Sequence, residues 1–549
     1  MQSKIQNPHE PKATDGVKSQ IHPPLFVLLA ALLLYGLRFG YDYGLSDQDE
    51  FLPYLLHRLD PSVLAQDWFV VGQAAAFSIR TYFVSMLHGL AQVIPVWMAV
   101  LGVYVAAWLL MAGAVYALAH AFTRNRLAAA ATVVVALVLT PQWTLGGNDL
   151  AHSMLVPSMA GWALGLWGLV FFLRCKALPS ALLLGLATWM QALVGLHLTG
   201  LLGLILLWRL ARREDVIRFL LVFAGTYVLA ALPALGPLVY QQFSSAPAAE
   251  GVPSLFYVLA QFRAPHHYLF YSFPTRSLIR FGALVGLGAI SFVLLARRRP
   301  VHHHAFLIRL LIGITGLCLL AFLCTEITPV PFVAQFQLFK TTVLAKLLMV
   351  ILICGAVAAW LPEALARFFE RLMDLKGWGL GVMSVLWVLV IGGIVGGVDA
   401  LRAKIGPLAH AGTPTALVET WAQTQTPSEA IFAVPPSWSG FRSRAQRAIV
   451  VNFKAFPYRT GFNHAWFERL TQLAPIPLPD RGSPALQDSL DAAFLRQSAS
   501  TLHRLARRYA FDYVVRDRPF SQESPSFEAV FTTSEWIVYR IDPENPPAE

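Results

Sequence analysis

Three carboxylates lie within four consecutive residues of one short segment. They belong to Asp47, Asp49 and Glu50. Carboxylates so close together can act as a general base for an acceptor hydroxyl, or hold a divalent cation against a phosphate. Asp47 and Asp49 are the pair that could bind such a cation, Mg²⁺ or Mn²⁺, and we expect no other cofactor. The alternative is a solvated turn in which Asp49 or Glu50 only caps a following helix.

Basic residues that could bind a phosphate occur in two later segments. Arg263, His266 and His267 stand close together, and arginine offers a fixed fork of donors that suits phosphate or pyrophosphate. Structural packing and a metal at one of the histidines are the alternatives for this segment. Lys340 and Lys346 lie in the first part of a later apolar segment. Lys346 lies inside it, where a cation normally faces the bundle interior or a cavity, whereas Lys340 could extend to the membrane surface.

Six further polar residues lie at the ends of apolar segments, on the side that also carries the acidic segment. They are Asp149, His152, Gln191, His197, Gln335 and Gln337. Any one of them alone is more often a helix-end or core polar group. Because all six share one side of the predicted topology, we expect them to contribute to substrate binding there.

The composition is that of an integral membrane protein. Of 549 residues, 56% are hydrophobic and only 13% are charged, whereas soluble domains carry about 25% charged residues. The apolar residues form blocks of about 20 residues, enough to cross the ~30 Å hydrocarbon layer. Much of the net charge of +11 lies in short runs between these blocks, at 124–126, 174–176, 209–213 and 297–299. That distribution is typical of cytoplasmic loops and does not indicate nucleic-acid binding.

Eleven apolar segments predict a helical transmembrane bundle over residues 24–398. The predicted spans are 24–41, 93–121, 127–141, 154–173, 178–193, 195–209, 216–240, 277–296, 306–325, 338–361 and 378–398. A cytoplasmic N-terminal tail, residues 1–23, places all four basic runs in the cytoplasm. The odd number of spans then places residues 399–549 outside the cytoplasm, together with the first outer loop, residues 41–92.

The two outer regions have secondary-structure patterns of their own. In residues 50–60, the apolar residues fall on one helical face, which predicts a helix along the membrane surface that ends at Asp60-Pro61. A second helix is predicted at 77–92. The tail is predicted to be an α/β domain with helices at 415–425, 465–473 and 485–510 and strands at 430–434, 448–453, 511–515 and 536–541.

Several classes of function lack their sequence signals. The chain has no glycine-rich dinucleotide motif after a strand, no Walker loop and no Gly-x-Ser-x-Gly motif, so a nucleotide-driven pump and a serine hydrolase have no support. The four cysteines all lie in or beside apolar segments, so the tail contains neither a disulfide framework nor a cysteine-based zinc site.

This layout resembles the GT-C glycosyltransferases, integral membrane enzymes that use polyprenyl-phosphate-linked sugars. More narrowly, residues 47–54, 59–62, 263–268, 335–340 and 426–436 resemble a bacterial membrane family of unknown function, DUF6798. The resemblance implies a catalytic acid in the first outer loop, at the position of Asp47 and Asp49, with Glu50 as a substitute. It also implies that basic residues near the outer surface, such as Arg263, bind the donor phosphate. The acidic motif here, Asp-x-Asp-Glu, departs from the simple acidic pair of those enzymes.

The leading hypothesis is therefore an inverting sugar transfer at the outer face of a bacterial inner membrane. The donor would be a polyprenyl-phosphate-linked sugar in contact with membrane lipids, and the acceptor an extracytoplasmic glycan, lipid or protein that the tail helps to bind. A transporter or flippase of a lipid-linked or amphipathic solute is the first alternative. A non-catalytic scaffold of the cell envelope is the second.

Overall fold

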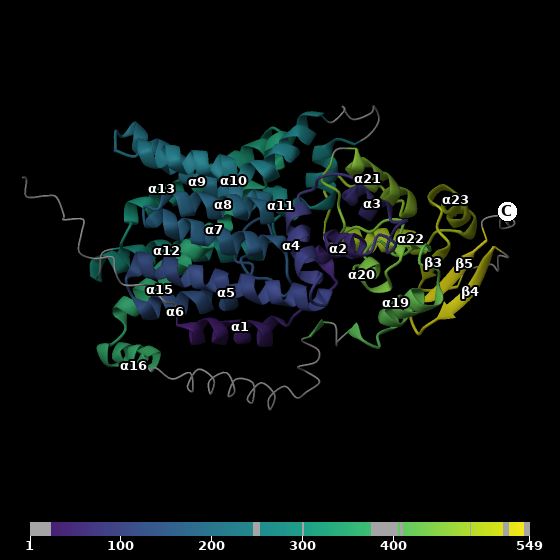
Figure 1. Ribbon diagram of the computed structural model, residues 1–549, viewed down its shortest axis with the longest axis horizontal. Helices are drawn as coiled ribbons and strands as arrows, with labels where there is room; N and C mark the ends of the chain where they lie inside the picture. Colours follow the sequence, from purple (N-terminus) through teal and green to yellow (C-terminus); the bar gives the residue numbers. More distant parts are fainter. Residues whose placement is uncertain are drawn as a thin grey trace, which may run out of the picture.

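The computed structural model describes residues 24–244, 253–298, 301–374, 405–406, 410–459, 461–483, 485–519 and 526–542. Long helices lie side by side along the longest axis of the molecule, and the C-terminal domain covers one end of this bundle (Figure 1). Short helices of the first outer loop lie between the two. The chain is thus a mostly helical, multi-pass membrane protein with a C-terminal α/β domain.

Apolar helices occupy ten of the eleven segments predicted to span the membrane. Six are long and apolar enough to cross it: α5 (Val96–Thr123), α9 (Ala192–Ala211), α10 (Ile217–Ser244), α12 (Thr275–Arg298), α13 (His304–Phe322) with its extension η5 (Leu323–Ile327), and the stretch Pro331–Trp360. The last comprises α14 (Pro331–Ala334), η6 (Leu338–Thr341) and α15 (Thr342–Trp360). Four are shorter: α1 (Leu25–Phe39), α6 (Arg126–Val134) with η2 (Val135–Leu139), α7 (Pro157–Leu173) and α8 (Ala177–Met190). The predicted span 378–398 and the tail 1–23 lie outside the described residues.

Helices that are apolar on every side form the interior of the bundle, as expected where no face needs water. Almost all of α15 is buried, and it packs beside α12 and α6. At the end of the bundle away from the C-terminal domain, the chain continues into the short helix α16 (Glu363–Asp374; Figure 1).

The first outer loop folds into η1 (Ser46–Glu50), α2 (Leu52–Leu59), α3 (Trp68–Ala74) and α4 (Thr81–Ala91). Both predicted helices exist, and α2 ends before Asp60 as predicted. Its expected position along the membrane surface stays a prediction. Leu52 and Leu55 are at most 1% exposed in the protein core, because α4 covers the apolar face of α2. Helix α3 was not predicted, and the side chain of Asp67 caps it.

The C-terminal domain is built on a five-stranded sheet in the order β2-β1-β3-β5-β4. Its strands are β1 (Ile431–Ala433), β2 (Ala448–Ile449), β3 (Tyr513–Arg516), β4 (Phe527–Thr532) and β5 (Ile537–Ile541). Strand β1 pairs in parallel with β2 and β3, while β5 is antiparallel to β3 and β4. The four predicted strands are confirmed, and β4 was missed.

Five helices flank this sheet: α19 (Pro414–Gln425), α20 (Phe441–Ala445), α21 (Phe462–Leu473), α22 (Leu486–Leu495) and α23 (Ala499–Tyr509). The single helix predicted at 485–510 is instead two helices. They separate because the hydroxyl of Ser498 caps a new helix by accepting a hydrogen bond from Thr501 N at 3.2 Å. Helices α19 and α21 match their predictions to within a few residues.

Candidate functional site

The carboxylate of Glu50 lies between two arginines at the end of the bundle that faces the C-terminal domain. Its Oε2 is 2.5 Å from Arg80 Nη2, and its Oε1 is 3.3 Å from Arg263 Nη2. The hydroxyl of Tyr458, from the C-terminal domain, lies 3.5 Å from Oε1. Glu50 is only 4% exposed, and a buried carboxylate requires this compensation. It therefore joins three distant parts of the chain.

Asp47 lies in a more open position nearby. Its carboxylate is 2.7 Å from Lys454 Nζ, and the two side chains are 45% and 37% exposed. The backbone carbonyl of Lys454 accepts a hydrogen bond from Arg263 Nη2 at 2.8 Å. The domain loop after β2 thus brings a cation to the acidic segment. We call Asp47, Glu50, Arg80, Arg263, Lys340 and Lys454 the charged cluster.

Lys340 is the cation of the charged cluster that has no direct protein partner. No hydrogen bond or ion pair joins its ammonium group to any part of the chain that the structure describes. It still interacts electrostatically with Asp47, Glu50 and Arg80. The cluster contains four cations against two carboxylates, so its net charge is positive. Such an excess suits an anionic ligand.

The charges of this cluster act electrostatically on His266. Burial and the cations Lys454, Arg263 and Lys340 lower its pKa to about 4, although Asp47 acts in the opposite direction. At neutral pH the imidazole is therefore uncharged and can donate one hydrogen bond to a ligand. A Cβ at Gly147 would lie 3.1 Å from the His266 ring, and the φ of +65° also favours glycine there.

Asp49 is only two residues from Asp47 but has a different environment. Its Oδ1 accepts a hydrogen bond from Gly440 N at 2.8 Å, and its Oδ2 accepts from Ser439 Oγ at 2.8 Å and Asn452 Nδ2 at 3.1 Å. The residue is 1% exposed, and burial raises the pKa of its carboxyl to about 6 despite these donors. Asp49 fixes the acidic segment to the C-terminal domain.

A second buried acid strengthens the same attachment. Asp67 Oδ2 accepts hydrogen bonds from Arg442 Nε at 2.7 Å and Ile449 N at 3.0 Å, and both charged side chains are at most 1% exposed. Arg442 also donates to Asn452 Oδ1 at 3.0 Å. We call Asp49, Asp67, Ser439, Gly440, Arg442 and Asn452 the anchoring interface.

Lys346 and Asp149, predicted to bind phosphate and substrate, bind each other instead. Lys346 Nζ lies 2.6 Å from Asp149 Oδ1, and their side chains are 0% and 7% exposed. The same carboxylate accepts hydrogen bonds from the backbone nitrogens of Gln142 and Leu150 at 2.6 and 2.7 Å. A buried ammonium group is stable only beside an opposite charge, so this pair accounts for both residues structurally.

Three other predicted site residues hold backbone or side-chain groups of the bundle. His197 Nε2 lies 2.7 Å from the carbonyl of Phe336. His267 Nδ1 lies 2.6 Å from the carbonyl of Gly146, and Gln337 donates to the hydroxyl of Tyr268. These contacts fix the loops that carry His266 and Lys340.

Gln191 and His152 lie near the charged cluster, whereas no contact joins Gln335 to it among the described residues. Gln191 Oε1 accepts a hydrogen bond from Arg80 Nη1 at 3.4 Å. His152 interacts electrostatically with Asp47, and its Nε2 has no hydrogen-bond partner within the described ranges. Gln335 is half-buried in the turn before η6.

The side chains proposed to share a divalent cation point to different partners: Asp47 to Lys454, and Asp49 to donors of the C-terminal domain. No group of three or more histidines, cysteines, aspartates or glutamates is gathered anywhere in the described residues. A metal requirement therefore stays a prediction.

The sequence did not reveal Arg80, Lys454 or Tyr458. Arg80 could have been noticed as a charged residue at the start of a predicted apolar helix in the outer loop. Lys454 and Tyr458 lie in an irregular segment after β2, where no periodicity marks them. Their role depends on the attachment of the domain to a loop about 400 residues earlier, which local sequence patterns do not show.

The fold and the charged cluster define a class: a multi-pass helical membrane protein whose C-terminal α/β domain completes a cationic site at one end of the bundle. The family model described as "Domain of unknown function (DUF6798)" matches residues 415–473. This confirms the resemblance to that family for the part of the tail that contains most of the anchoring interface, Lys454 and Tyr458.

Two solved structures are similar to the chain over nearly its whole length. The first is ArnT from Cupriavidus metallidurans in the apo state, with 14% identity, a TM-score of 0.47, and coverage of 96% of this chain and 98% of ArnT. The second is the same protein bound to undecaprenyl phosphate, with 14% identity, a TM-score of 0.46, and coverage of 94% and 97%. No curated protein matches the sequence.

Proposed function

We propose that this protein is a membrane glycosyltransferase that transfers a sugar from a polyprenyl-phosphate-linked donor to an acceptor outside the cytoplasm. One observation carries the proposal: an excess of cations surrounds one accessible carboxylate, Asp47, at the end of a membrane bundle. The resemblance of the acidic segment and its layout to GT-C glycosyltransferases supports the same reaction. The lipid donor explains why the site adjoins membrane helices and why the chain lacks a nucleotide loop.

The cations of the charged cluster would bind the donor phosphate. Lys340 has no direct partner of its own among the described residues, so an incoming phosphate would give it one. Arg263, Lys454 and Lys340 all act electrostatically on His266. Negative charge grows on the phosphate as the sugar leaves, and fixed cations stabilise that charge in the transition state.

Asp47 is the general base in this proposal. It would remove the proton of the acceptor hydroxyl while that oxygen attacks the anomeric carbon and the bond to the phosphate oxygen breaks. The products are the glycosylated acceptor, polyprenyl phosphate and a protonated Asp47, and the attack inverts the anomeric configuration. Asp49 is sequestered by three donors, and Glu50 instead holds Arg80 and Arg263 in place.

The orientation in a bacterial inner membrane is also part of the proposal. The basic runs lie at junctions of consecutive bundle helices: α5 with α6, α7 with α8, α9 with α10, and α12 with α13. A contact between His302 N and Phe122 O, at 3.0 Å, brings two of these junctions together. The positive-inside rule places such junctions in the cytoplasm, which supports an extracytoplasmic site.

A transporter or flippase is the second candidate, because the Lys346–Asp149 pair is an ionisable pair within the helical bundle. That pair has only internal partners, whereas the charged cluster has spare cations. Sugar transfer is therefore the better-supported function.

In the test, membranes that contain the full chain are incubated with a panel of polyprenyl-phosphate-linked sugars, each labelled in its sugar part. Label that leaves the donor lipid is measured. Asp47→Asn should reduce its transfer by about 100-fold or more, the usual effect of removing a general base. Asp60→Asn, an exposed carboxylate of the same loop, is the control. Undiminished transfer by Asp47→Asn, or movement of labelled lipid across vesicles without transfer, would overturn the proposal.

A further inference from the structure

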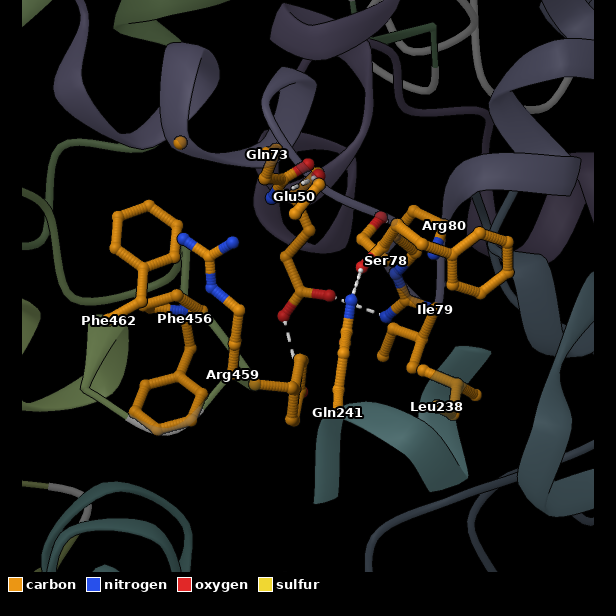
Figure 2. A pocket seen from close by; sticks show the side chains of 15 residues that line it. Glu50, Gln73, Ser78, Ile79, Arg80, Leu238, Gln241, Phe456, Arg459 and Phe462 are labelled. Carbon is orange, nitrogen blue, oxygen red and sulfur yellow. Dashed lines mark hydrogen bonds and ion pairs between the residues drawn. The ribbon is translucent and has the colours of Figure 1, made fainter. Parts of the chain in front are cut away.

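An open cavity adjoins Glu50 between the bundle and the C-terminal domain (Figure 2). Its walls come from four places: α3, the segment 76–80, the end of α10, and the domain segment 456–462. Asp47 and Lys340 are not among its lining residues. The cavity is therefore separate from the part of the charged cluster that we assign to the donor phosphate, and Glu50 and Arg80 form the wall that both share.

Two polar groups of the cavity have unused binding capacity. Gln73 is 8% exposed and donates to the carbonyl of Glu50, but its Oε1 has no partner in the described part of the chain. Arg459 extends between Phe462 and Glu50 (Figure 2), and no ion pair joins it to a described residue. Since Arg80 and Arg263 already compensate Glu50, Arg459 adds a positive charge to the cavity.

The remaining walls combine aromatic rings with hydrogen-bonding groups. The Arg459 guanidinium lies 5.3 Å from the centre of the Phe462 ring, and Phe456 and Tyr458 line the same side. Flat apolar rings beside convergent donors and acceptors suit a ring that carries hydroxyl groups, such as a sugar. The unpaired guanidinium suits an acidic substituent on that ring.

The cavity also adjoins a strongly apolar outer surface. Leu238 and Gln241 of α10 line it, and they alternate with residues that face outward. Of these, Val239, Tyr240 and Phe243 are 52%, 73% and 82% exposed. Such a surface lies against lipid in a membrane-spanning helix. A ligand with a polar head and an apolar chain could therefore place its head in the cavity and its chain against the apolar surface of α10.

We propose that this cavity binds the acceptor, and that the acceptor is the acidic sugar headgroup of a lipid. The inference rests on the proposed transferase function, which it deepens by naming the acceptor class. A hydroxyl of that headgroup would pass Arg80, which interacts with both Glu50 and Asp47, to reach the base. The acceptor and the donor phosphate thus approach from opposite sides of one arginine–carboxylate wall.

The test measures binding and needs no turnover. Octyl glucoside 6-phosphate has an acidic sugar head and an alkyl chain joined through the anomeric oxygen. Its anomeric carbon carries no phosphate leaving group, so it cannot serve as a donor. It is titrated against the full chain in lipid nanodiscs, beside glucose 6-phosphate and octyl glucoside. Arg459→Gln should weaken its binding about tenfold or more, as expected for loss of a charge-assisted hydrogen bond. Arg504→Gln, an exposed arginine of α23, is the matched control and should bind normally.

Farnesyl phosphate, a short polyprenyl phosphate, is titrated against the same proteins and Lys340→Gln. Lys340→Gln should weaken the binding of farnesyl phosphate. Arg459→Gln should keep its affinity for farnesyl phosphate within about twofold of the wild-type value. Failure of farnesyl phosphate to bind contradicts the proposed donor site but not the cavity. Equal binding of octyl glucoside 6-phosphate by wild type and Arg459→Gln overturns the cavity assignment. If the wild type binds glucose 6-phosphate as tightly as octyl glucoside 6-phosphate, the proposal that the ligand is a lipid is wrong. If it binds octyl glucoside as tightly as octyl glucoside 6-phosphate, the proposal that the headgroup is acidic is wrong.

Discussion

The charged cluster and the anchoring interface both join the first outer loop to the C-terminal domain, but their charges are balanced differently. The cluster also includes Arg263 and Lys340 from later segments of the bundle. In the anchoring interface, each buried carboxylate accepts hydrogen bonds from several donors. In the charged cluster, cations outnumber carboxylates and Lys340 has no direct partner among the described residues. One region is complete in the protein alone, whereas the other has capacity for a ligand.

The acidic segment divides between these regions because it forms a 3₁₀ turn. In such a turn successive residues are rotated by about 120°, so Asp47 and Asp49 point in different directions. Asp49 attaches the segment to the C-terminal domain, which leaves Asp47 beside Lys454 at the open side. The C-terminal domain is therefore part of the site itself and not only a separate acceptor-binding module.

The largest expected effect on stability comes from the anchoring interface. Asp67→Ala removes the partner of Arg442 and the N-terminal cap of α3 in one change. Breaking a buried ion pair leaves an uncompensated charge, so the free energy of unfolding should fall by about 3–5 kcal/mol. Chemical denaturation of the detergent-solubilised protein measures this. Asp60→Ala, which loses only local contacts with Ser62, is the control. A loss below about 1 kcal/mol would contradict the assigned role of Asp67.

A smaller loss is expected at the glycine that contacts Asp49. A Cβ at Gly440 would lie 2.1 Å from the carbonyl oxygen of Gly44, and the φ there is +87°. Gly412 has a similar φ of +81° with open space around it, so Gly412→Ala isolates the backbone strain of about 1–2 kcal/mol. Gly440→Ala should destabilise the protein more than Gly412→Ala and should also release the C-terminal domain to limited proteolysis. Equal effects of the two substitutions would show that the close approach is not required.

A third effect depends on pH and belongs to Asp49. Its pKa in the folded protein is about 6, above the ordinary value of 3.8, so the folded state keeps a proton that the unfolded chain has released. Stability should therefore fall as pH rises from about 4 to about 6, by at most about 1.4 kcal/mol per pH unit. Asp49→Asn should remove this slope. Denaturation of both proteins between pH 4 and 7 gives the difference, and parallel curves would contradict the prediction.

Sequence patterns predicted the bundle well because long apolar segments are a strong signal. Ten predicted spans correspond to described apolar helices, and the short strands β1, β3 and β5 lie where apolar runs predicted them. The helix at 485–510 was too long because Ser498 looked like an ordinary helix residue, although its hydroxyl starts α23. Strand β4 was missed because its apolar run, Ala529–Phe531, is only three residues long and only Phe527 of the strand is fully buried.

The site was predicted less completely because pairing between distant residues decides which charges are available. Asp47, Glu50, Arg263 and Lys340 were all selected from the sequence, and the structure brings them together. Lys346 was also selected correctly as a buried cation, but its partner Asp149 lies 197 positions earlier in the chain. No local pattern distinguishes a lysine that binds a ligand from one that compensates an internal carboxylate.

The smallest stability effect should occur at Lys454, where the comparison between the two regions is sharpest. Its ion pair with Asp47 is partly exposed, so Lys454→Gln should change the free energy of unfolding by less than about 1 kcal/mol. Burial alone would raise the pKa of Asp47, but Lys454 holds that pKa well below its ordinary value. Without the lysine the carboxyl should titrate at higher pH, and the acid limb of the transfer activity should move upward.

Arg540→Gln is the control for Lys454→Gln, because Arg540 forms a more exposed ion pair with Glu528 on β4, whose side chains are 60% and 62% exposed. It should have the same small effect on unfolding but leave the pH profile of transfer unchanged. If Lys454→Gln instead lowers the free energy of unfolding by about 2 kcal/mol or more, Lys454 belongs to the anchoring interface. Asp47 would then be a structural carboxylate like Asp49, and the acidic segment would serve only to attach the domain.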